Sequence, residues 1–279
     1  MSVGTSVPSP GLACALTRVN VVPVPSDADP RPPLDAERLA ALGVEVLPEA
    51  GSTNALVADR AREGAPAWLA VATEHQQAGR GRLDRVWETP PRAALTFSTL
   101  LRPNAPAAEW PWLPLLAGIA TVRALGDHGV PSGLKWPNDL MLGERKAAGI
   151  LVERVDTPTG PAAVLGIGLN VTTTEAELPV PTATSVLLAA GSAPDRTDLL
   201  VSLLGHLREQ YAAWSSGGGR SLRPAYVEAC VTLGREVRVA LPGGGDLTGL
   251  ATDVDAGGRL VVAGTPVAAG DVLHVRPAG

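Results

Sequence analysis

The sequence predicts an α/β (α+β) protein in which a larger domain precedes a small C-terminal β-barrel. Segments with strand periodicity and segments with helix periodicity alternate along most of the chain before residue 232. After Thr232 the composition changes to short alternating strands separated by Gly- and Pro-containing turns. The 279 residues are also enough to bury one large core and one small one.

Helices are expected where apolar residues recur at helical spacing and a cap or a glycine marks an end. These helices are 34–42, 53–63, 111–128, 195–214 and 222–231. Strands are expected where apolar and β-branched residues alternate or run together. These strands are 44–47, 68–74, 94–101, 139–142, 146–155 and 163–171, together with a short strand that Pro137 ends.

Four further strands are expected near the C-terminus, at 235–241, 246–254, 259–262 and 271–275. The residues before 34 are rich in Pro, Ser, Asp and Gly and show no period, so they predict a mobile tail. We therefore expect three parts: the tail at 1–33, the larger domain at 34–231 and the barrel at 232–279.

The composition excludes several classes of protein. No apolar run approaches the ~18 residues of a membrane span, and the N-terminus lacks a secretory signal, so no membrane partner is expected. Cys14 and Cys230 lie far apart, which fits a reducing cytoplasm and no disulfide framework. The four histidines show no metal-ligand spacing. A net charge of −5 argues against bulk binding of nucleic acid.

The most distinctive stretch is 76–87, which places Arg80, Arg82 and Arg85 among two glycines. Glycine permits backbone conformations closed to other residues, and arginine supplies a planar cationic fork for phosphate or carboxylate. Repulsion between like charges opposes order here, so the stretch is expected to become ordered when an anion arrives. The plainer interpretation is a solvated basic loop.

Two polar turns are also candidate binding elements. In Gly-Ser-Thr-Asn at 51–54, Ser52 or Thr53 caps the following helix, and the same junction offers hydrogen-bonding groups to a ligand. In Lys-Trp-Pro-Asn-Asp at 135–139, Lys135 and Asp139 flank the turn that Pro137 begins. Each turn taken alone is also explained by capping or by surface charge.

Two strands carry residues that an apolar strand does not need. Lys146 opens a strand that is otherwise almost wholly apolar, so it either reaches outward to solvent or points into a site. Gly166 and Gly168 lie on one face of the next strand, which ends at the polar Asn170. Glycines weaken a strand, so another group is expected to approach that face closely.

The common nucleotide and acyl-enzyme motifs are absent from the sequence. The Gly-Arg-Gly-Arg segment at 79–82 lacks the third glycine of a dinucleotide fingerprint, and no Walker Gly-Lys-Ser/Thr or Gly-x-Ser-x-Gly elbow occurs. What remains is an arginine-glycine loop, two lysines and an Asn-Asp turn. This set fits adenylation, in which a carboxylate attacks the α-phosphate of ATP and two repelling anions must be held together.

These segments together resemble the biotin protein ligase family, of the biotin–[acetyl-CoA-carboxylase] ligase type. They occur in the family's order, and the resemblance runs from about residue 35 to the C-terminus. The matching segments are 51–54, 76–87, 135–139, 146–153 and 166–170. The resemblance implies a catalytic domain like that of class II aminoacyl-tRNA synthetases, with a mixed or antiparallel sheet, followed by an SH3-like barrel.

The resemblance also implies the reaction, in which biotin and MgATP give biotinyl-5′-AMP and a lysine of an acceptor domain then attacks it. The acceptor would be a biotin carboxyl carrier protein or the acceptor domain of a biotin-dependent carboxylase, and the enzyme a cytoplasmic monomer or homodimer. The implied biotin-binding residues are Ser52, Thr53, Asn54, Gln76, Arg80, Gly81, Arg82, Lys146 and Gly149. The implied ATP and adenylate residues are Arg82, Trp87, Lys135, Asn138 and Asn170. The implied catalytic residues are Lys146, Arg82, Lys135 and Asp139, with Asp139 also a possible Mg²⁺ ligand.

The sequence departs from the family pattern in two places. Leu83-Asp84 replaces a basic or polar residue followed by glycine, and the DNA-binding domain of bifunctional members is missing, which puts repressor function in doubt. Two alternatives stay open: a lipoate–protein ligase with the same adenylation chemistry, and a non-catalytic biotin-responsive regulator. Biotin is favoured over lipoate by the Ser-Thr-Asn and Gly-Arg-Gly-Arg segments, and no DNA-binding element supports the regulator.

Overall fold

The computed structural model describes Met1 and residues 31–82, 85–241 and 244–274. Most of the expected tail, Cys14 and the pair Leu83-Asp84 therefore lie outside the described residues. Met1–Pro32 and Pro33–Gly279 are two units, and the description that follows concerns the second unit.

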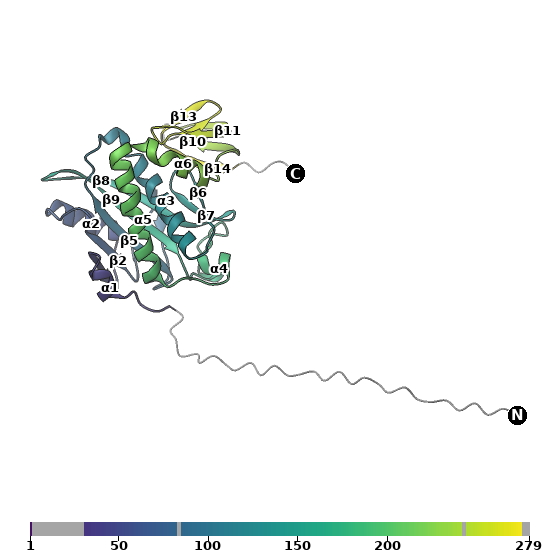
Figure 1. Ribbon diagram of the computed structural model, residues 1–279. Coiled ribbons are helices and arrows are strands. Elements are labelled where there is room, and N and C mark those ends of the chain that lie inside the picture. Colours follow the sequence, from purple (N-terminus) through teal and green to yellow (C-terminus); the bar gives the residue numbers. More distant parts are fainter. Residues whose placement is uncertain (2–30, 83–84, 242–243, 275–279) are drawn as a thin grey trace. The chain divides into compact units, whose positions relative to one another are not determined.

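The centre of this unit is a mixed sheet (Figure 1). Within the described residues it has seven strands in the order β1-β2-β5-β9-β8-β7-β6, of which only the pair β1–β2 is parallel. Its strands are β1 (Val44–Leu47), β2 (Ala70–Thr73), β5 (Ala94–Leu101), β6 (Gly133–Lys135), β7 (Asp139–Leu142), β8 (Arg145–Thr157) and β9 (Gly160–Asn170). All of these strands were predicted, β6 from the proline that follows it and the others from their apolar patterns.

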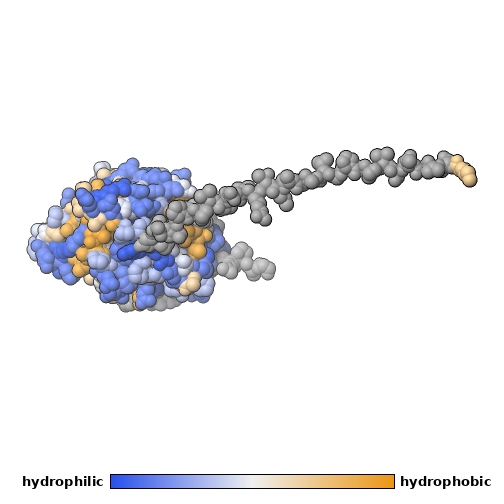
Figure 2. Space-filling view, turned by 90° about the horizontal axis from the view of Figure 1, so that it is seen from below, coloured by the Kyte–Doolittle hydropathy of each residue, from blue (hydrophilic) through white to orange (hydrophobic). Residues whose placement is uncertain are grey.

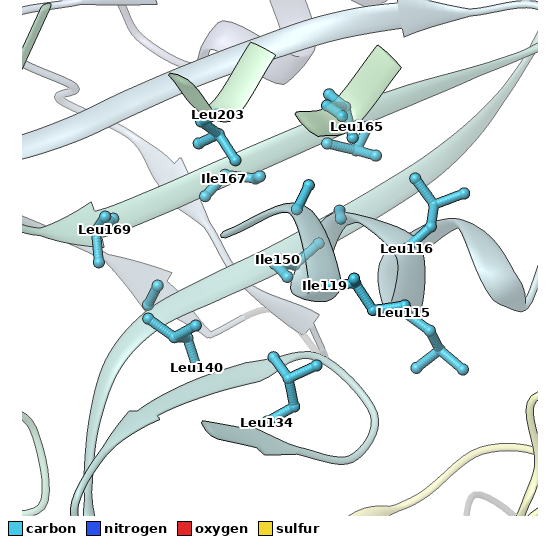
Figure 3. Packing of buried hydrophobic residues seen from close by; sticks show 14 of the residues in the cluster. Leu115, Leu116, Ile119, Leu134, Leu140, Ile150, Leu165, Ile167, Leu169 and Leu203 are labelled. Atoms are coloured by element: carbon cyan, nitrogen blue, oxygen red, sulfur yellow. The ribbon is translucent and has the colours of Figure 1, made fainter. Parts of the chain in front are cut away.

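Helices cover both faces of the sheet. The helices are α1 (Ala36–Ala40), α2 (Thr53–Arg62), α3 (Trp112–Asp127), α4 (Val186–Ala190), α5 (Arg196–Gly217) and α6 (Gly219–Ala229). Figure 1 shows α3 and α5 side by side over one face. In Figure 3 their side chains meet those of the sheet, with labels at Leu115, Leu116, Ile119, Ile150, Leu165, Ile167 and Leu203. The short helix α4 was not predicted.

The two faces of β9 differ because successive side chains of a strand point to opposite sides. Leu165 and Ile167 face the core beneath α3 and α5, whereas Val164 packs with α2 in a second buried cluster. Gly166 and Gly168 therefore lie on the α2 face of the sheet. They leave space there that larger side chains would fill, and this face carries the candidate site.

The C-terminal region forms a small antiparallel sheet, in the order β13-β12-β11-β10-β14. Its strands are β10 (Glu236–Ala240), β11 (Asp246–Val254), β12 (Leu260–Val262), β13 (Thr265–Val267) and β14 (Asp271–His274). The strand β13 was not predicted, because Pro266 and the neighbouring glycines read as a turn. Its Pro266 pairs with Val261 at the edge of the sheet, a position that tolerates proline.

The C-terminal sheet shares its core with the main sheet. Buried Val237 and Val239 belong to the same apolar cluster as Leu134. Two tryptophans also donate hydrogen bonds to one C-terminal turn: Trp112 Nε1 to the Ala256 carbonyl at 2.7 Å and Trp136 Nε1 to the Gly258 carbonyl at 3.0 Å. These bonds fix the C-terminal sheet against the end of the main sheet.

On the face shown in Figure 2 hydrophilic residues predominate and hydrophobic ones gather in separate patches. Among the described residues no helix combines the length and the apolar character needed to cross a bilayer. Cys230 is a buried free thiol, and burial raises its pKa.

Candidate active site

A cavity of about 890 Å³ opens on the α2 face of the main sheet, and β14 contributes to its wall. Every site residue that the sequence predicted lines this one cavity. These residues are Ser52, Thr53, Asn54, Gln76, Arg80, Gly81, Arg82, Trp87, Lys135, Asn138, Asp139, Lys146, Gly149 and Asn170. Segments separated by more than a hundred residues in the chain therefore meet at a single site.

The floor of the cavity is built by the N-terminus of α2. Ser52 caps this helix, since its hydroxyl accepts a hydrogen bond from the Ala55 N–H at 3.4 Å. The N–H of Thr53 donates a hydrogen bond to Gln76 Oε1 at 2.9 Å. Thr53, Asn54 and Gln76 are all buried. The Ser52 hydroxyl thus caps the helix, and Ser52, Thr53 and Asn54 also line the cavity. Capping is confirmed, and binding of a ligand by this segment stays a prediction.

Asn54 is held by two partners in the floor. Its Nδ2 donates to Glu153 Oε2 at 2.6 Å, and its Oδ1 accepts from Ser98 Oγ at 2.6 Å. A Cβ atom on Gly166 would lie 2.1 Å from Asn54 Oδ1. The expected close approach to this face of β9 is therefore confirmed, and Asn54 is one of the approaching groups.

The second approaching group is Trp87. A Cβ atom on Gly168 would lie 2.5 Å from its Nε1, and one on Gly149 would lie 3.5 Å from its ring. The indole Nε1 is buried and has no hydrogen-bond partner among the described residues. An unpaired buried donor costs free energy unless a ligand satisfies it.

Lys146 points into the cavity and does not reach outward to solvent. Its Nζ lies 2.6 Å from Asp139 Oδ1 and 5.9 Å from the centre of the Trp87 ring. The adjacent Asn138 is fixed by its Nδ2, which donates to the Ile150 carbonyl at 2.9 Å. At the far end Asn170 Nδ2 donates to the Thr184 carbonyl at 3.0 Å.

The basic stretch forms a short hairpin of β3 (Gly79–Arg80) and β4 (Val86–Trp87), which the sequence analysis did not predict. Arg82 links the hairpin to the rest of the cavity wall. Its Nη1 donates to Asn138 Oδ1 at 3.2 Å and to the Gly270 carbonyl at 3.5 Å. Arg85 forms a two-bond ion pair with Asp271.

Two carboxylates of the protein lie against the arginines of this stretch. Arg85 meets Asp271, and Arg80 Nη2 lies 3.7 Å from Glu153 Oε1. That the stretch becomes ordered when an anion arrives stays a prediction. Opposite charges from β14 and β8 offset the repulsion among the arginines.

The cavity carries more positive charge than its carboxylates neutralise. Within the described residues its lining holds six cations and four carboxylates. Burial lowers the pKa of Arg82 and of Lys135, and Asp271 and Asp139 oppose this lowering at both groups. The two cations are thus partly removed from water, and an anionic ligand would replace the interactions that water no longer supplies.

The sequence analysis missed four residues that shape the site. Ser98 and Glu153 support Asn54, Asp271 holds the hairpin, and His274 lines the cavity from β14. Burial lowers the pKa of His274 to about 4, helped by Lys135. Glu153 was visible only as a polar exception in an apolar strand. No local signal marked Asp271 or His274, because their position depends on how the C-terminal sheet docks.

The arrangement combines a hydrogen-bonding floor with a cationic upper part in one cavity. The floor fits a neutral polar ring, and the upper part fits two anionic groups held close together. The cavity-lining residues within the described ranges include no Ser–His or Cys–His pair of the kind that forms an acyl-enzyme. Fold and site define the class: an α/β enzyme that activates a carboxylate with a nucleotide.

Comparisons with known proteins identify the family. Residues 49–170 match the Biotin/lipoate A/B protein ligase family, and residues 232–275 match the Biotin protein ligase C terminal domain. The biotin–[acetyl-CoA-carboxylase] ligase of Mycobacterium tuberculosis is 40% identical over 265 residues, which is 88% of this chain and 97% of the relative. The bifunctional ligase/repressor BirA of Bacillus subtilis is 30% identical over 76% of this chain and 66% of its own length.

Solved structures agree with this assignment. A biotin protein ligase from Aquifex aeolicus, in complex with biotin and ATP, superposes with a TM-score of 0.71 at 26% identity, covering 84% of this chain and 99% of that one. The chain belongs to the biotin protein ligase family.

Proposed function

We propose that this protein adenylates biotin with ATP and transfers the biotinyl group to a lysine of a biotin carboxyl carrier protein or of the acceptor domain of a biotin-dependent carboxylase. The observation that carries the proposal is the single cavity that joins the hydrogen-bonding floor around Thr53 to the cations Arg82, Lys135 and Lys146. Two similar proteins support it: the biotin–[acetyl-CoA-carboxylase] ligase of Mycobacterium tuberculosis, and the biotin protein ligase of Aquifex aeolicus, whose structure contains biotin and ATP.

Biotin lies with its ureido ring on the floor and its carboxylate toward the cations. The ring is neutral and carries N–H donors and a carbonyl acceptor, which match the polar groups of Ser52, Thr53, Asn54 and Gln76. Gly149 lies beside the bound acid next to Lys146 and Trp87, each of which a Cβ atom there would approach to 3.5 Å. Arg80, Gly81 and Arg82 cover the bound acid from the hairpin.

ATP occupies the cationic part of the cavity. Trp87, whose Nε1 lacks a partner among the described residues, faces the adenylate together with Asn138 and Asn170. A carboxylate oxygen of biotin attacks the α-phosphorus, the bond to the β-phosphate oxygen breaks, and pyrophosphate leaves. Lys146, Arg82 and Lys135 stabilise the charge on the transferring phosphoryl group.

Mg²⁺ would enter with the phosphates of ATP. The described residues contain no group of three metal-ligating side chains, and the Asp139 carboxylate is already paired with Lys146. A single nearby carboxylate fits an ion that is held mainly by phosphate and water, which is the usual mode for Mg²⁺. Asp139 would be its one protein carboxylate. The bound ion would neutralise phosphate charge.

In the second step the amine of the acceptor lysine attacks the carbonyl carbon of biotinyl-5′-AMP, an amide bond forms, and AMP leaves. We propose that this occurs in the cytoplasm, in a monomer or homodimer. We also propose that residues 34–231 form the catalytic domain, related in fold to class II aminoacyl-tRNA synthetases, and that residues 232–279 form an SH3-like barrel. The family match that begins at residue 232 supports this boundary.

The decisive experiment incubates the full chain with ATP, labelled biotin and an acceptor domain, and reads the acceptor by mass. The expected result is one biotinyl group per acceptor, with pyrophosphate release that requires biotin. Lipoate offered in place of biotin should release far less pyrophosphate. Equal turnover of lipoate would move the assignment to lipoate ligation, and no pyrophosphate from either acid would exclude adenylation.

A further inference from the structure

A chain of hydrogen bonds runs from Glu153, outside the cavity lining, to Thr53 in its floor. Neither Glu153 nor Ser98 is among the residues that line the cavity. The links are Glu153 Oε2 to Asn54 Nδ2 at 2.6 Å, Asn54 Oδ1 to Ser98 Oγ at 2.6 Å, and Ser98 Oγ to Thr53 Oγ1 at 2.7 Å. The proposed chemistry gives no role to Glu153 or to Ser98.

The carboxylate at one end sets the direction of every bond in the chain. An ionised carboxylate only accepts hydrogen bonds, so Asn54 must turn its NH₂ toward Glu153 and its Oδ1 toward Ser98. The one hydroxyl proton of Ser98 is then donated to Asn54 Oδ1. Ser98 has no proton left for Thr53, so the Thr53 hydroxyl donates to Ser98 Oγ at 2.7 Å rather than along its longer contact with Gln76 Oε1 at 3.2 Å.

This direction decides what the floor offers to a ligand. The proton of Thr53 is committed beneath the floor, and Thr53 Oγ1 therefore faces the cavity with lone pairs only. The neighbouring Gln76 offers a ligand a donor. Its Oε1 accepts from the Thr53 N–H at 2.9 Å, so its Nε2 remains for the ligand. The floor thus presents an acceptor and a donor side by side.

We propose that Glu153 is a positioning residue that makes the floor specific for a ring N–H donor next to a carbonyl, the pattern of a cyclic urea. This inference rests on the proposed function, since it concerns how the biotin ring is selected. A dithiolane ring has no N–H to donate and would leave Thr53 Oγ1 unpaired. In this chain the carboxylate acts on the ring through Asn54, Ser98 and Thr53. Its other contact, with Arg80 Nη2 at 3.7 Å, is separate from the chain and is not expected to discriminate between ring N–H and ring oxygen.

The test replaces Glu153 with glutamine, which keeps the shape but offers both an oxygen and an NH₂ to Asn54. Asn54 is then free to flip, and Thr53 is free to present its proton to the cavity. We expect Glu153→Gln to weaken biotin binding roughly tenfold to a hundredfold, the usual effect of one mismatched buried hydrogen bond. Binding of ATP alone should not change, which also shows that the variant is folded.

The discriminating probes are the two biotin analogues in which one ring N–H is replaced by oxygen, giving cyclic carbamates. They keep the ring shape but turn a donor into an acceptor. We expect the wild type to prefer biotin strongly over the analogue altered at the Thr53 side, and this preference should fall at least about tenfold in Glu153→Gln. Ser98→Ala, which removes the middle of the chain, should reduce the preference in the same direction.

The matched control is Asp156→Asn, which removes a carboxylate from the same strand β8 where it pairs with Arg154 at 3.0 Å, away from the cavity. It should keep the wild-type affinities. Two results would overturn the inference. One is a Glu153→Gln variant that binds biotin as tightly as the parent. The other is a variant that binds biotin more weakly but prefers it over the carbamates as strongly as the parent does. A wild type that binds no biotin would overturn the proposed function itself.

Discussion

At the scale of single residues, two glycines of β9 face the two parts of the cavity that we propose for biotin and for ATP. Gly166 faces Asn54 in the floor, and Gly168 faces Trp87 in the cationic part. A Cβ atom at either position would force its neighbour to move, because it would lie 2.1 Å from Asn54 Oδ1 or 2.5 Å from Trp87 Nε1. Two substitutions one step apart on the same face should therefore affect different ligands.

Gly166→Ala should weaken biotin binding about tenfold and leave ATP almost unaffected, because it displaces Asn54. Gly168→Ala should do the reverse, because it displaces Trp87. Isothermal titration with each ligand alone measures both effects. Gly205→Ala is the control, since a Cβ atom there meets nothing within 4 Å in helix α5. If both variants weakened the same ligand, the proposed division of the cavity would be wrong.

Lys146 is the residue on which adenylation should depend most. Its Nζ lies within the cavity beside Asp139, where it can meet the attacking carboxylate and the α-phosphate. Lys146→Ala should lower the rate of biotin-dependent pyrophosphate exchange by about a hundredfold to a thousandfold, as expected for a lost charge at a transition state. Arg145→Ala is the neighbouring control, because Arg145 pairs with exposed Glu175 at 2.6 Å. Wild-type exchange in Lys146→Ala would refute this role.

At the scale of elements, the basic hairpin β3–β4 is held by β14. The contact is the ion pair of Arg85 with Asp271, whose side chains are 59% and 39% exposed. Donation by Arg85 lowers the pKa of Asp271, so the pair is charged at neutral pH. An exposed pair adds little to global stability, typically below about 1 kcal/mol, but it can restrain a short hairpin.

Asp271→Asn should accordingly loosen the hairpin without unfolding the protein. Amide hydrogen exchange should become faster at Gly81, whose N–H bonds to the Arg85 carbonyl at 2.6 Å, while the main sheet stays protected. The melting temperature should change little. Asp246→Asn, which removes a weaker partner of Arg238 at 3.7 Å, is the control. Unchanged exchange at Gly81 would mean that β14 does not restrain the hairpin.

Sequence reasoning reached most of the elements and the residues of one cavity, and the reasons for its failures are physical. Periodicity reports burial along one element, so β5 and β9 were predicted well. Pairing between β3 and β4 involves only two residues on each side, too few to show a period. The roles of Asp271 and Glu153 depend on contacts between distant segments, which no local pattern encodes.

At the scale of the whole molecule, the C-terminal sheet is both a structural partner and part of the cavity wall. Lys135 in β6 and His274 in β14 line the same cavity although they lie 139 positions apart in the sequence. His274 Nε2 lies 3.3 Å from Thr232 Oγ1, at the start of the C-terminal region. Protonation of this histidine should therefore report on the junction between the two sheets.

His274 should make the stability of the protein sensitive to mild acid. Burial, with Lys135 and Arg235, lowers its pKa from 6.5 to about 4 in the folded state. The unfolded chain thus binds more protons between these two values, so stability is complete above pH 6.5 and falls as the pH drops toward 4. After a discount for solvent screening the loss amounts to about 1–2 kcal/mol. His274→Gln should remove this part of the slope, and urea unfolding at about pH 7 and about pH 5 measures it. Equal pH dependence in variant and parent would show that His274 is as free to protonate in the folded protein as in the unfolded one, and hence that the two sheets do not enclose it.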